Sequence, residues 1–324
     1  MEKLTYNISL QDKLIEKILA YYDTIWKDSP NDIRHEEWLR NFMGDFTSDA
    51  EKEQLHALFL LSKFMYFGNK EIKELLKCIY RDLFKYPIIA QIRKKNNNTI
   101  DTDYLNKEYE KELKKSRFLG VGNPSESGVH LLYYFRQENC LSRDYFINIH
   151  EIFNIHNDKL ELSDKNIKRY IFIDDFCGEG TQAKTYLGKW IEKIKNLYPS
   201  IEIYYYMLFG VEKGIKYIKK KTKLDDVKAI FTIDDTFKCF SENSRYFKTK
   251  EHEDIEKGFC EKISKHYGEK LISEAPLGYK NGQLLLSFFH NTPDNTLPIF
   301  WSDENEWKPI FKRYPKIYGG ISDE

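Results

Sequence analysis

The middle of the chain carries the stretch Tyr170-Ile171-Phe172-Ile173-Asp174-Asp175-Phe176-Cys177-Gly178-Glu179-Gly180-Thr181-Gln182. Four apolar residues are followed by two carboxylates, and a glycine-containing turn then leads into a segment with helical periodicity. A run that is apolar on both faces is typical of a strand covered by helices on each side. The stretch therefore predicts a buried strand over 170–173, a turn, and the N-terminus of a helix.

Strand and helix patterns alternate after this stretch. We expect helices over 181–197 and 212–221, and strands over 201–209 and 227–233. A β-α-β-α-β order at this spacing predicts a parallel sheet. The apolar run 283–289 is expected to form a further strand. The predicted fold class is α/β, with a doubly wound parallel sheet.

The residues before the sheet have a helical pattern. Apolar residues recur at helical spacing from Leu14 to Ile25 and from Ile72 to Leu83, which predicts amphipathic helices. Thr47-Ser48-Asp49 followed by Glu51 predicts a helix start. The polar stretch 94–115 is either a surface helix or a linker. We expect an N-terminal α-helical domain over 1–110 and an α/β domain over 111–324.

Charge and composition narrow the class of protein. The 324 residues include 51 basic and 51 acidic side chains, so the formal net charge is zero. A nucleic-acid coat or a polybasic membrane binder needs a positive field, so no direct nucleic-acid partner is expected. The sequence contains no run of 18 apolar residues, so no membrane-spanning helix is expected. The five cysteines form no CxxC pair, which indicates reduced thiols and a cytoplasmic location.

The acid pair and the turn after it are the strongest candidate site. Ligands of doubly wound sheets bind at the carboxyl ends of strands, and a helix N-terminus offers free N–H groups to an anion. Gly178 and Gly180 allow the backbone to wrap closely around a phosphate, and Thr181 adds a hydroxyl donor. Asp174 and Asp175 can hold ribose hydroxyls, directly or through a divalent cation. The alternative is an incidental acidic strand end before a capped helix.

A second glycine-containing loop, residues 118–130, precedes an expected helix over 129–137. Ser125, Ser127 and Gly128 can donate hydroxyl and amide hydrogens to a diphosphate, and Arg136 can approach the same anion as a bidentate partner. The alternative is an ordinary turn in which Ser125 or Ser127 caps the helix.

The C-terminal part supplies further polar candidates. Asn291 and Asn295 can recognise a base or cap the turns of the chain itself. Trp301 and Trp307 can stack on a base, or they can close the core.

The stretch 170–182 resembles the phosphoribosyl-pyrophosphate loop of type I phosphoribosyltransferases, which has four apolar residues, two acids and a Gly/Thr turn. In that family the acids contact the ribose 2′- and 3′-hydroxyls, the loop holds the 5′-phosphate, and Mg²⁺ binds the pyrophosphate. The resemblance implies that Asp174 and Asp175 are catalytic and metal-associated residues. It implies a 5′-phosphate cradle made of Cys177, Gly178, Gly180, Thr181 and Gln182. The loop over residues 118–130, here called the upstream loop, precedes the acid pair by about as many residues as the pyrophosphate-binding loop does in that family.

One position departs from the family pattern. Purine-salvage members often carry an aspartate three residues after the second acid, and Gly178 occupies that position here. The neighbouring Glu179 is either a displaced catalytic acid or base, or a side chain that faces solvent.

Three stretches together resemble a narrower family, the phosphoribosyltransferase-like effectors predicted in bacterial conflict and antiviral systems. They are Gly122–Gly128, Ile173–Gln182 (here called the acid loop) and Asn291–Trp301. An N-terminal helical region belongs to the same pattern, and the resemblance covers most of residues 35–315. It implies an enzyme that acts on phosphoribosyl pyrophosphate (PRPP) or a 5′-phosphorylated nucleotide, with a retron or nucleotide-signalling protein as possible partner. The alternatives are a catalytically inactive nucleotide-sensing module that controls a partner protein, and a structural scaffold.

Overall fold

The computed structural model describes residues 9–27, 34–122, 127–156, 159–248 and 254–314. Its contacts divide the chain into two compact units. The first, here called the sheet unit, is the continuous segment Glu71–Ile233. The second, here called the discontinuous unit, combines Met1–Lys70 with Asp234–Glu324. The divisions fall at 70/71 and 233/234 and not at the boundary 110/111 expected from the sequence.

The sheet unit is built on four parallel strands in the order β2-β5-β6-β7. Their bounds are β2 Ser116–Gly120, β5 Arg169–Cys177, β6 Glu202–Val211 and β7 Asp226–Ile233. Helices α8 (Thr181–Leu197) and α9 (Glu212–Lys221) connect the last three strands. The predicted alternation of strand and helix is therefore confirmed. Strand β5 is longer than expected, because its pairing with β6 continues past the acid pair to Cys177 and Gly210.

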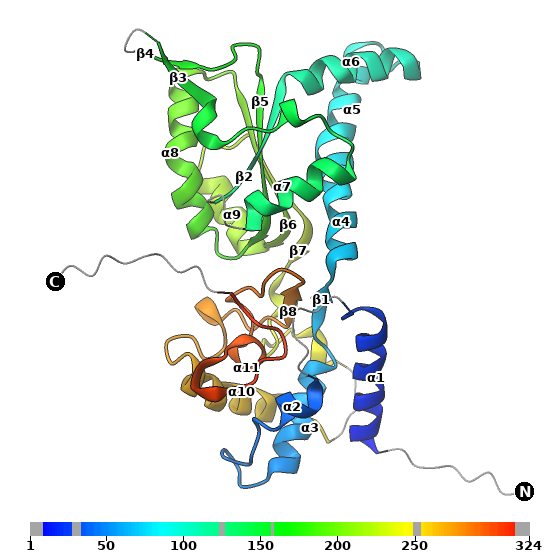
Figure 1. The fold of residues 1–324 in the computed structure, drawn as a ribbon, viewed down its shortest axis with the longest axis vertical. Coiled ribbons are helices and arrows are strands. Elements are labelled where there is room, and N and C mark those ends of the chain that lie inside the picture. Colours follow the sequence, from blue (N-terminus) through cyan, green and yellow to red (C-terminus); the bar gives the residue numbers. More distant parts are fainter. Residues whose placement is uncertain (1–8, 28–33, 123–126, 157–158, 249–253, 315–324) are drawn as a thin grey trace, which may run out of the picture. The chain divides into compact units, whose positions relative to one another are not determined.

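Helices cover both faces of this sheet (Figure 1). Phe172 lies in one buried cluster with Leu187 of α8 and Ile218 of α9. On the other face the ring of Phe118 lies 5.2 Å from that of Phe135 in α7 (Ser127–Glu138). This arrangement confirms the doubly wound fold class.

The winding changes direction between β2 and β5. Phe118 of β2 pairs with Ile171 of β5 on one side and forms a parallel bridge with Phe146 on the other. The chain therefore leaves β2 through α7 toward one edge and returns past β2 to build the rest of the sheet. In open α/β sheets this switch point is where ligands bind, outside the carboxyl ends of the strands.

The remaining elements of the sheet unit lie around this core. The π-helical stretch η1 contributes Phe84, whose ring lies 5.0 Å from that of Phe118. The polar stretch 94–115 contains a helix, α6, whose N-terminus is capped by Asp101. The bounds are η1 Ile79–Lys85, α5 Tyr86–Lys95, α6 Thr102–Lys114, η2 Arg143–Tyr145, η3 Ile149–Ile152, β3 Phe153–His156 and β4 Lys159–Leu162, with α4 (Asn69–Cys78) leading in.

The discontinuous unit joins the N-terminal helices to the C-terminal part of the chain. Strand β1 pairs in parallel with β8, and the indole of Trp38 stacks on Phe300 at 5.2 Å. The expected strand over 283–289 is thus short, and it lies outside the main sheet. The bounds are α1 Leu10–Thr24, α2 His35–Leu39, α3 Ala50–Leu61, β1 Met65–Phe67, η4 Asp235–Phe237, η5 Arg245–Phe247, α10 Lys257–Leu271, η6 Tyr279–Asn281, β8 Leu286–Phe288, α11 Pro298–Trp301 and η7 Glu304–Glu306.

The predicted helix start near residue 49 is confirmed, because the Asp49 carboxylate accepts a hydrogen bond from the Lys52 amide at 3.0 Å. One turn later Glu53 is fully buried and accepts hydrogen bonds from the amides of Gly44, Phe46 and Thr47. Such bonds allow a carboxylate to remain in the core. Within the described residues no helix is long and apolar enough to cross a membrane.

Candidate functional site

The acid pair lies at the carboxyl end of β5, at the switch point of the sheet. Asp174 and Asp175 are 8% and 9% exposed. Asp174 lies on the α8 side of the sheet, where Phe172 and Tyr205 also lie, and its carboxyl group interacts directly with that of Asp175. The Tyr205 hydroxyl donates to Asp174 Oδ2 at 2.7 Å, and the Asp175 amide donates to Asp174 Oδ1 at 3.0 Å. The first carboxylate is therefore fixed by the neighbouring strand.

The ionisation of Asp174 is strongly perturbed. Burial and, second, the charge of Asp175 raise the pKa of Asp174 well above its ordinary value, and the hydrogen bond from Tyr205 offsets this only in part. Two adjacent carboxylates in a dry site do not both ionise readily. Without a bound ligand, this environment favours the protonated form of Asp174 more than water does.

The turn after the acids packs directly on α9. A Cβ atom at Gly214 would lie 1.8 Å from the carbonyl oxygen of Gly178. Gly180 has a φ of +79°, and a Cβ there would lie 2.9 Å from the carbonyl oxygen of Gly214. The turn therefore needs glycine at 180 for its backbone angle and at 214 for the close approach of two backbones.

Helix α8 begins without a side-chain cap. Gly180 is its N-cap residue, and no side chain accepts a hydrogen bond from its first turn. Thr181 and Gln182 are exposed, and the amides of a helix's first turn have no partner within the helix. An N-terminus of a 17-residue helix in this state favours a bound anion.

The other members of the predicted cradle differ in exposure. The Cys177 thiol is buried among core side chains, and burial raises its pKa to about 12. Only the backbone of Cys177 can therefore serve an anion. Gly178 and Glu179 are partly exposed, which leaves Glu179 accessible to a ligand.

The upstream loop starts beside the acid pair. The Val121 amide donates to the Ile173 carbonyl at 3.1 Å, and the Tyr186 hydroxyl of α8 donates to the Gly122 carbonyl at 2.9 Å. The backbone of Gly128 returns to the same place, since a Cβ there would lie 2.4 Å from the Val121 carbonyl oxygen. The structure thus brings both ends of the upstream loop to the end of β5.

The two predicted serines of this loop cannot be placed. Ser125 lies outside the described residues, and of Ser127 only the backbone, at the start of α7, is described.

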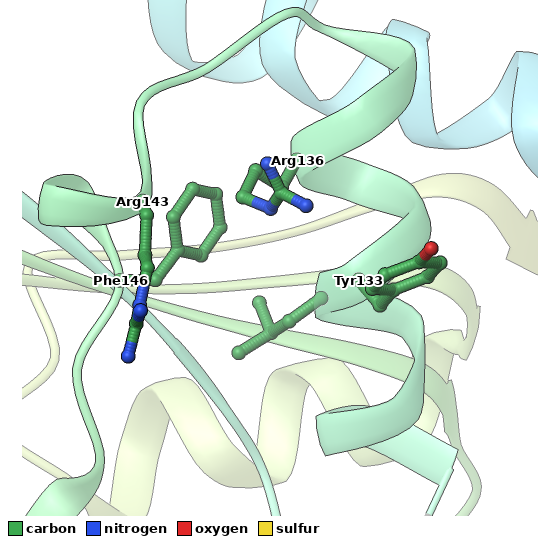
Figure 2. Close-up of a pocket in the computed structure, with 5 residues that line it drawn as sticks. Tyr133, Arg136, Arg143 and Phe146 are labelled. Carbon is green, nitrogen blue, oxygen red and sulfur yellow. The ribbon is translucent and has the colours of Figure 1, made fainter.

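Arg136 is not brought to this site. It lies eight residues after Gly128 on α7, roughly 12 Å further along the helix axis. Its side chain lines a pocket with Arg143 and Phe146 (Figure 2). This distance along α7 separates Arg136 from the loop that the sequence predicts to bind the diphosphate.

Asn291 and Asn295 lie in the discontinuous unit and bond within it. The Asn295 amide donates to the Tyr279 carbonyl at 3.1 Å, and Asn291 Oδ1 accepts from the amides of Thr292 and Tyr314. The indole nitrogens of Trp301 and Trp307 also donate to backbone carbonyls. These contacts match the turn-capping and core alternatives.

Asp174 and Asp175 are the carboxylates of this site that could bind magnesium. No group of three or more His, Cys, Asp or Glu placed to bind a metal occurs in the described part of the chain. Mg²⁺ commonly takes one or two carboxylates and fills its shell with water and substrate phosphates. Asp174 and Asp175 fit a cation of that kind, one that arrives with a diphosphate.

Comparison with known proteins gives the family. The model of the PRTase-CE family matches residues 35–313. The chain belongs to the PRTase-CE family. The match includes the acid loop, the upstream loop and the segment around Asn291, as the resemblance implied.

The other comparisons add little to this assignment. Among solved structures, a xanthine-guanine-hypoxanthine phosphoribosyltransferase of Helicobacter pylori aligns with 52% of this chain and 92% of its own, at 11% identity and a TM-score of 0.27. No curated protein matches significantly.

Three residues that organise the site were missed by sequence reasoning. Tyr205 holds Asp174, Tyr186 holds the upstream loop, and Gly214 receives the turn. Of these three, only Gly214 could have been found from the sequence. It lies inside a predicted helix, where glycine is unfavourable unless close packing requires it.

Proposed function

We propose that this member of the PRTase-CE family binds PRPP or a 5′-phosphorylated nucleotide and makes or breaks the N-glycosidic bond at ribose C1. The observation that carries the proposal is the position of Asp174 and Asp175. They lie at the switch point, next to an uncapped helix N-terminus and beside the upstream loop. A ribose with phosphates on two sides needs carboxylates that accept hydrogen bonds from its hydroxyls. It also needs, on each side, groups that donate hydrogen bonds to a phosphate.

The chain's own groups would share the work as follows. The amides at the start of α8 and the Thr181 hydroxyl hold the 5′-phosphate. Asp174 and Asp175 accept hydrogen bonds from the ribose hydroxyls, and their charge stabilises positive charge that develops at C1. The upstream loop, whose two described ends are Gly122 and Gly128, would donate to the diphosphate. Magnesium bound with the diphosphate supplies positive charge for the leaving group.

Glu179 is the chain's candidate for proton transfer to or from the base. It follows Gly178, the position at which purine-salvage enzymes often carry an acid, and it is partly exposed. A partly exposed carboxylate one residue away can reach a base by a modest shift of the turn.

A second candidate is a nucleotide-sensing module that does not turn over its ligand. It is favoured by Gly178 and by the raised pKa of Asp174, because a protonated acid stabilises positive charge at C1 poorly. In either case we propose a cytoplasmic effector of bacterial antiphage defence. Its partner would be a protein of a retron or nucleotide-signalling cassette.

The test is incubation with PRPP, Mg²⁺ and a panel of bases and nucleotides. Release of pyrophosphate or free base supports the enzyme, and tight binding without turnover supports the sensor. The double variant Asp174→Asn/Asp175→Asn should lose turnover at least about 100-fold, as expected when transition-state charge stabilisation is removed. The matched control is Asp23→Asn/Asp144→Asn, two exposed aspartates. Wild-type turnover in the first double variant contradicts the proposal.

A further inference from the structure

A pocket of about 340 Å³ lies against α7, on the side of the β2 edge. Leu132, Tyr133 and Arg136 of α7 line it together with Arg143 and Phe146 (Figure 2). The proposed reaction uses none of these residues. The volume is within the range of small-molecule sites, about 300–1,000 Å³.

The two arginines are the positively charged groups of this pocket. Within the described residues neither forms an ion pair. The nearest acids in sequence bond elsewhere: Glu138 lies 3.3 Å from Lys77 and 3.7 Å from Lys73, and Asp144 accepts from the Ser142 hydroxyl at 3.2 Å. Two guanidinium groups without carboxylate partners favour a bound oxyanion, and a phosphate matches their planar donor geometry best.

The pocket also offers two aromatic rings of different character. Phe146 is fixed, because its ring lies 5.6 Å from Phe118 and 6.2 Å from Phe135 in the core. Tyr133 is 55% exposed and its ring centroid lies 5.9 Å from the Arg136 guanidinium carbon. In Figure 2 the ring of Phe146 is drawn between the side chains of Arg143 and Arg136. An exposed ring next to a cation suits stacking of a flat heteroaromatic group.

We propose that this pocket is a second ligand site, which binds a nucleoside monophosphate. The phosphate would bond to Arg136, Arg143 would add positive charge from the other side of the Phe146 ring, and the base would stack on Tyr133. The site is separate from the acid loop, because Arg136 lies about 12 Å along α7 from the residue that approaches β5. It does not depend on the reaction proposed above.

The test is titration calorimetry of the full chain in the Asp174→Asn/Asp175→Asn background, without Mg²⁺. AMP, GMP, CMP and UMP are compared with inorganic phosphate and with adenosine. We expect at least one nucleotide to bind more tightly than either fragment. Arg136→Ala/Arg143→Ala should weaken that nucleotide by at least about tenfold, the effect of losing one charge-assisted contact. Tyr133→Ala should weaken the nucleotide and leave phosphate binding unchanged.

The control is Arg40→Ala/Lys189→Ala, which removes two exposed cations outside the pocket and should leave the affinity unchanged. Equal melting temperatures of the variants confirm that their folding is intact. The proposal is overturned by an unchanged nucleotide affinity in Arg136→Ala/Arg143→Ala. It is also overturned by phosphate binding as tightly as every nucleotide, or by no binding of any nucleotide at millimolar concentration.

Discussion

Asp174 lies in the fold in an environment that disfavours its charge. Its pKa is raised by burial and by Asp175, so its contribution to stability is fully present below its unfolded pKa. That contribution is lost as the pH rises through the folded pKa. Asp174→Asn removes the charge and keeps the shape. We expect the variant to be more stable than the wild type at neutral pH, by a few degrees in Tm, and the difference to grow from pH 4 upward.

Thermal unfolding at pH values between 4 and 8.5 measures this difference. Asp23→Asn, at an exposed position of α1, is the matched control and should show no such trend. A constant difference between Asp174→Asn and wild type across this range contradicts the assigned ionisation. The same variant should lose the proposed ribose contact, so gain of stability and loss of function would occur together.

Single residues of the site were predictable to different degrees. The acids and the glycines could be predicted from the local sequence, because charges directly after an apolar run and glycines directly before a helix form a recognisable pattern. Tyr205 lies 31 residues from Asp174, and only the register of β5 against β6 places it there. Arg136 lies about two turns of α7 beyond Gly128, and the sequence pattern predicts this helix but not which of its ends approaches the acid pair.

At the scale of elements, α6 is tied to the sheet through Glu112. Its carboxylate accepts from Lys115 at 2.8 Å and from the buried Arg169 of β5 at 2.7 Å. Burial opposes its charge, but these two hydrogen bonds outweigh it and lower the pKa of Glu112 to about 2. The stabilisation is present above the unfolded pKa and is lost as the pH falls through the folded value.

Glu112→Gln should therefore destabilise the protein by about 1–3 kcal/mol at pH 7, the range for a hydrogen bond to a charged group. The difference from wild type should shrink between pH 4.5 and 2. Urea denaturation at these pH values is the measurement. Glu108→Gln on the same helix removes only a surface pair with Lys111 and should change stability by less than about 0.5 kcal/mol. Equal effects of the two substitutions would contradict a special role for Glu112.

Most elements were predictable because their signals are local. Helices α8 and α9 have the predicted bounds, since a glycine or a strand end marks where each begins. Strand β5 was underestimated because charged residues were taken as its end. The ladder with β6 continues through them, and backbone pairing does not depend on whether the side chain is apolar.

At the scale of the whole molecule, the division into units was the least predictable feature. The sequence reading grouped residues 1–110 by their helical pattern, yet periodicity shows only that a helix has an apolar face. It does not show which surface that face covers. Phe84 of η1 packs on Phe118 of β2, and Tyr109 of α6 lies 6.4 Å from Phe84. The segment 71–110 therefore completes the sheet unit.

This organisation predicts which fragment of the chain folds alone. Residues 71–233 form one continuous unit, and we expect this fragment to unfold cooperatively, as most small single domains do. Residues 111–233 lack η1 and most of α6. They would expose the β2 face around Phe118, so we expect aggregation or loss of cooperative unfolding, because an uncovered apolar sheet face is an association site. Circular dichroism during thermal unfolding, with size-exclusion chromatography, compares the two fragments. A cooperative, monomeric fragment 111–233 beside an unfolded fragment 71–233 would show that residues 71–110 do not belong to the unit that carries the acid pair.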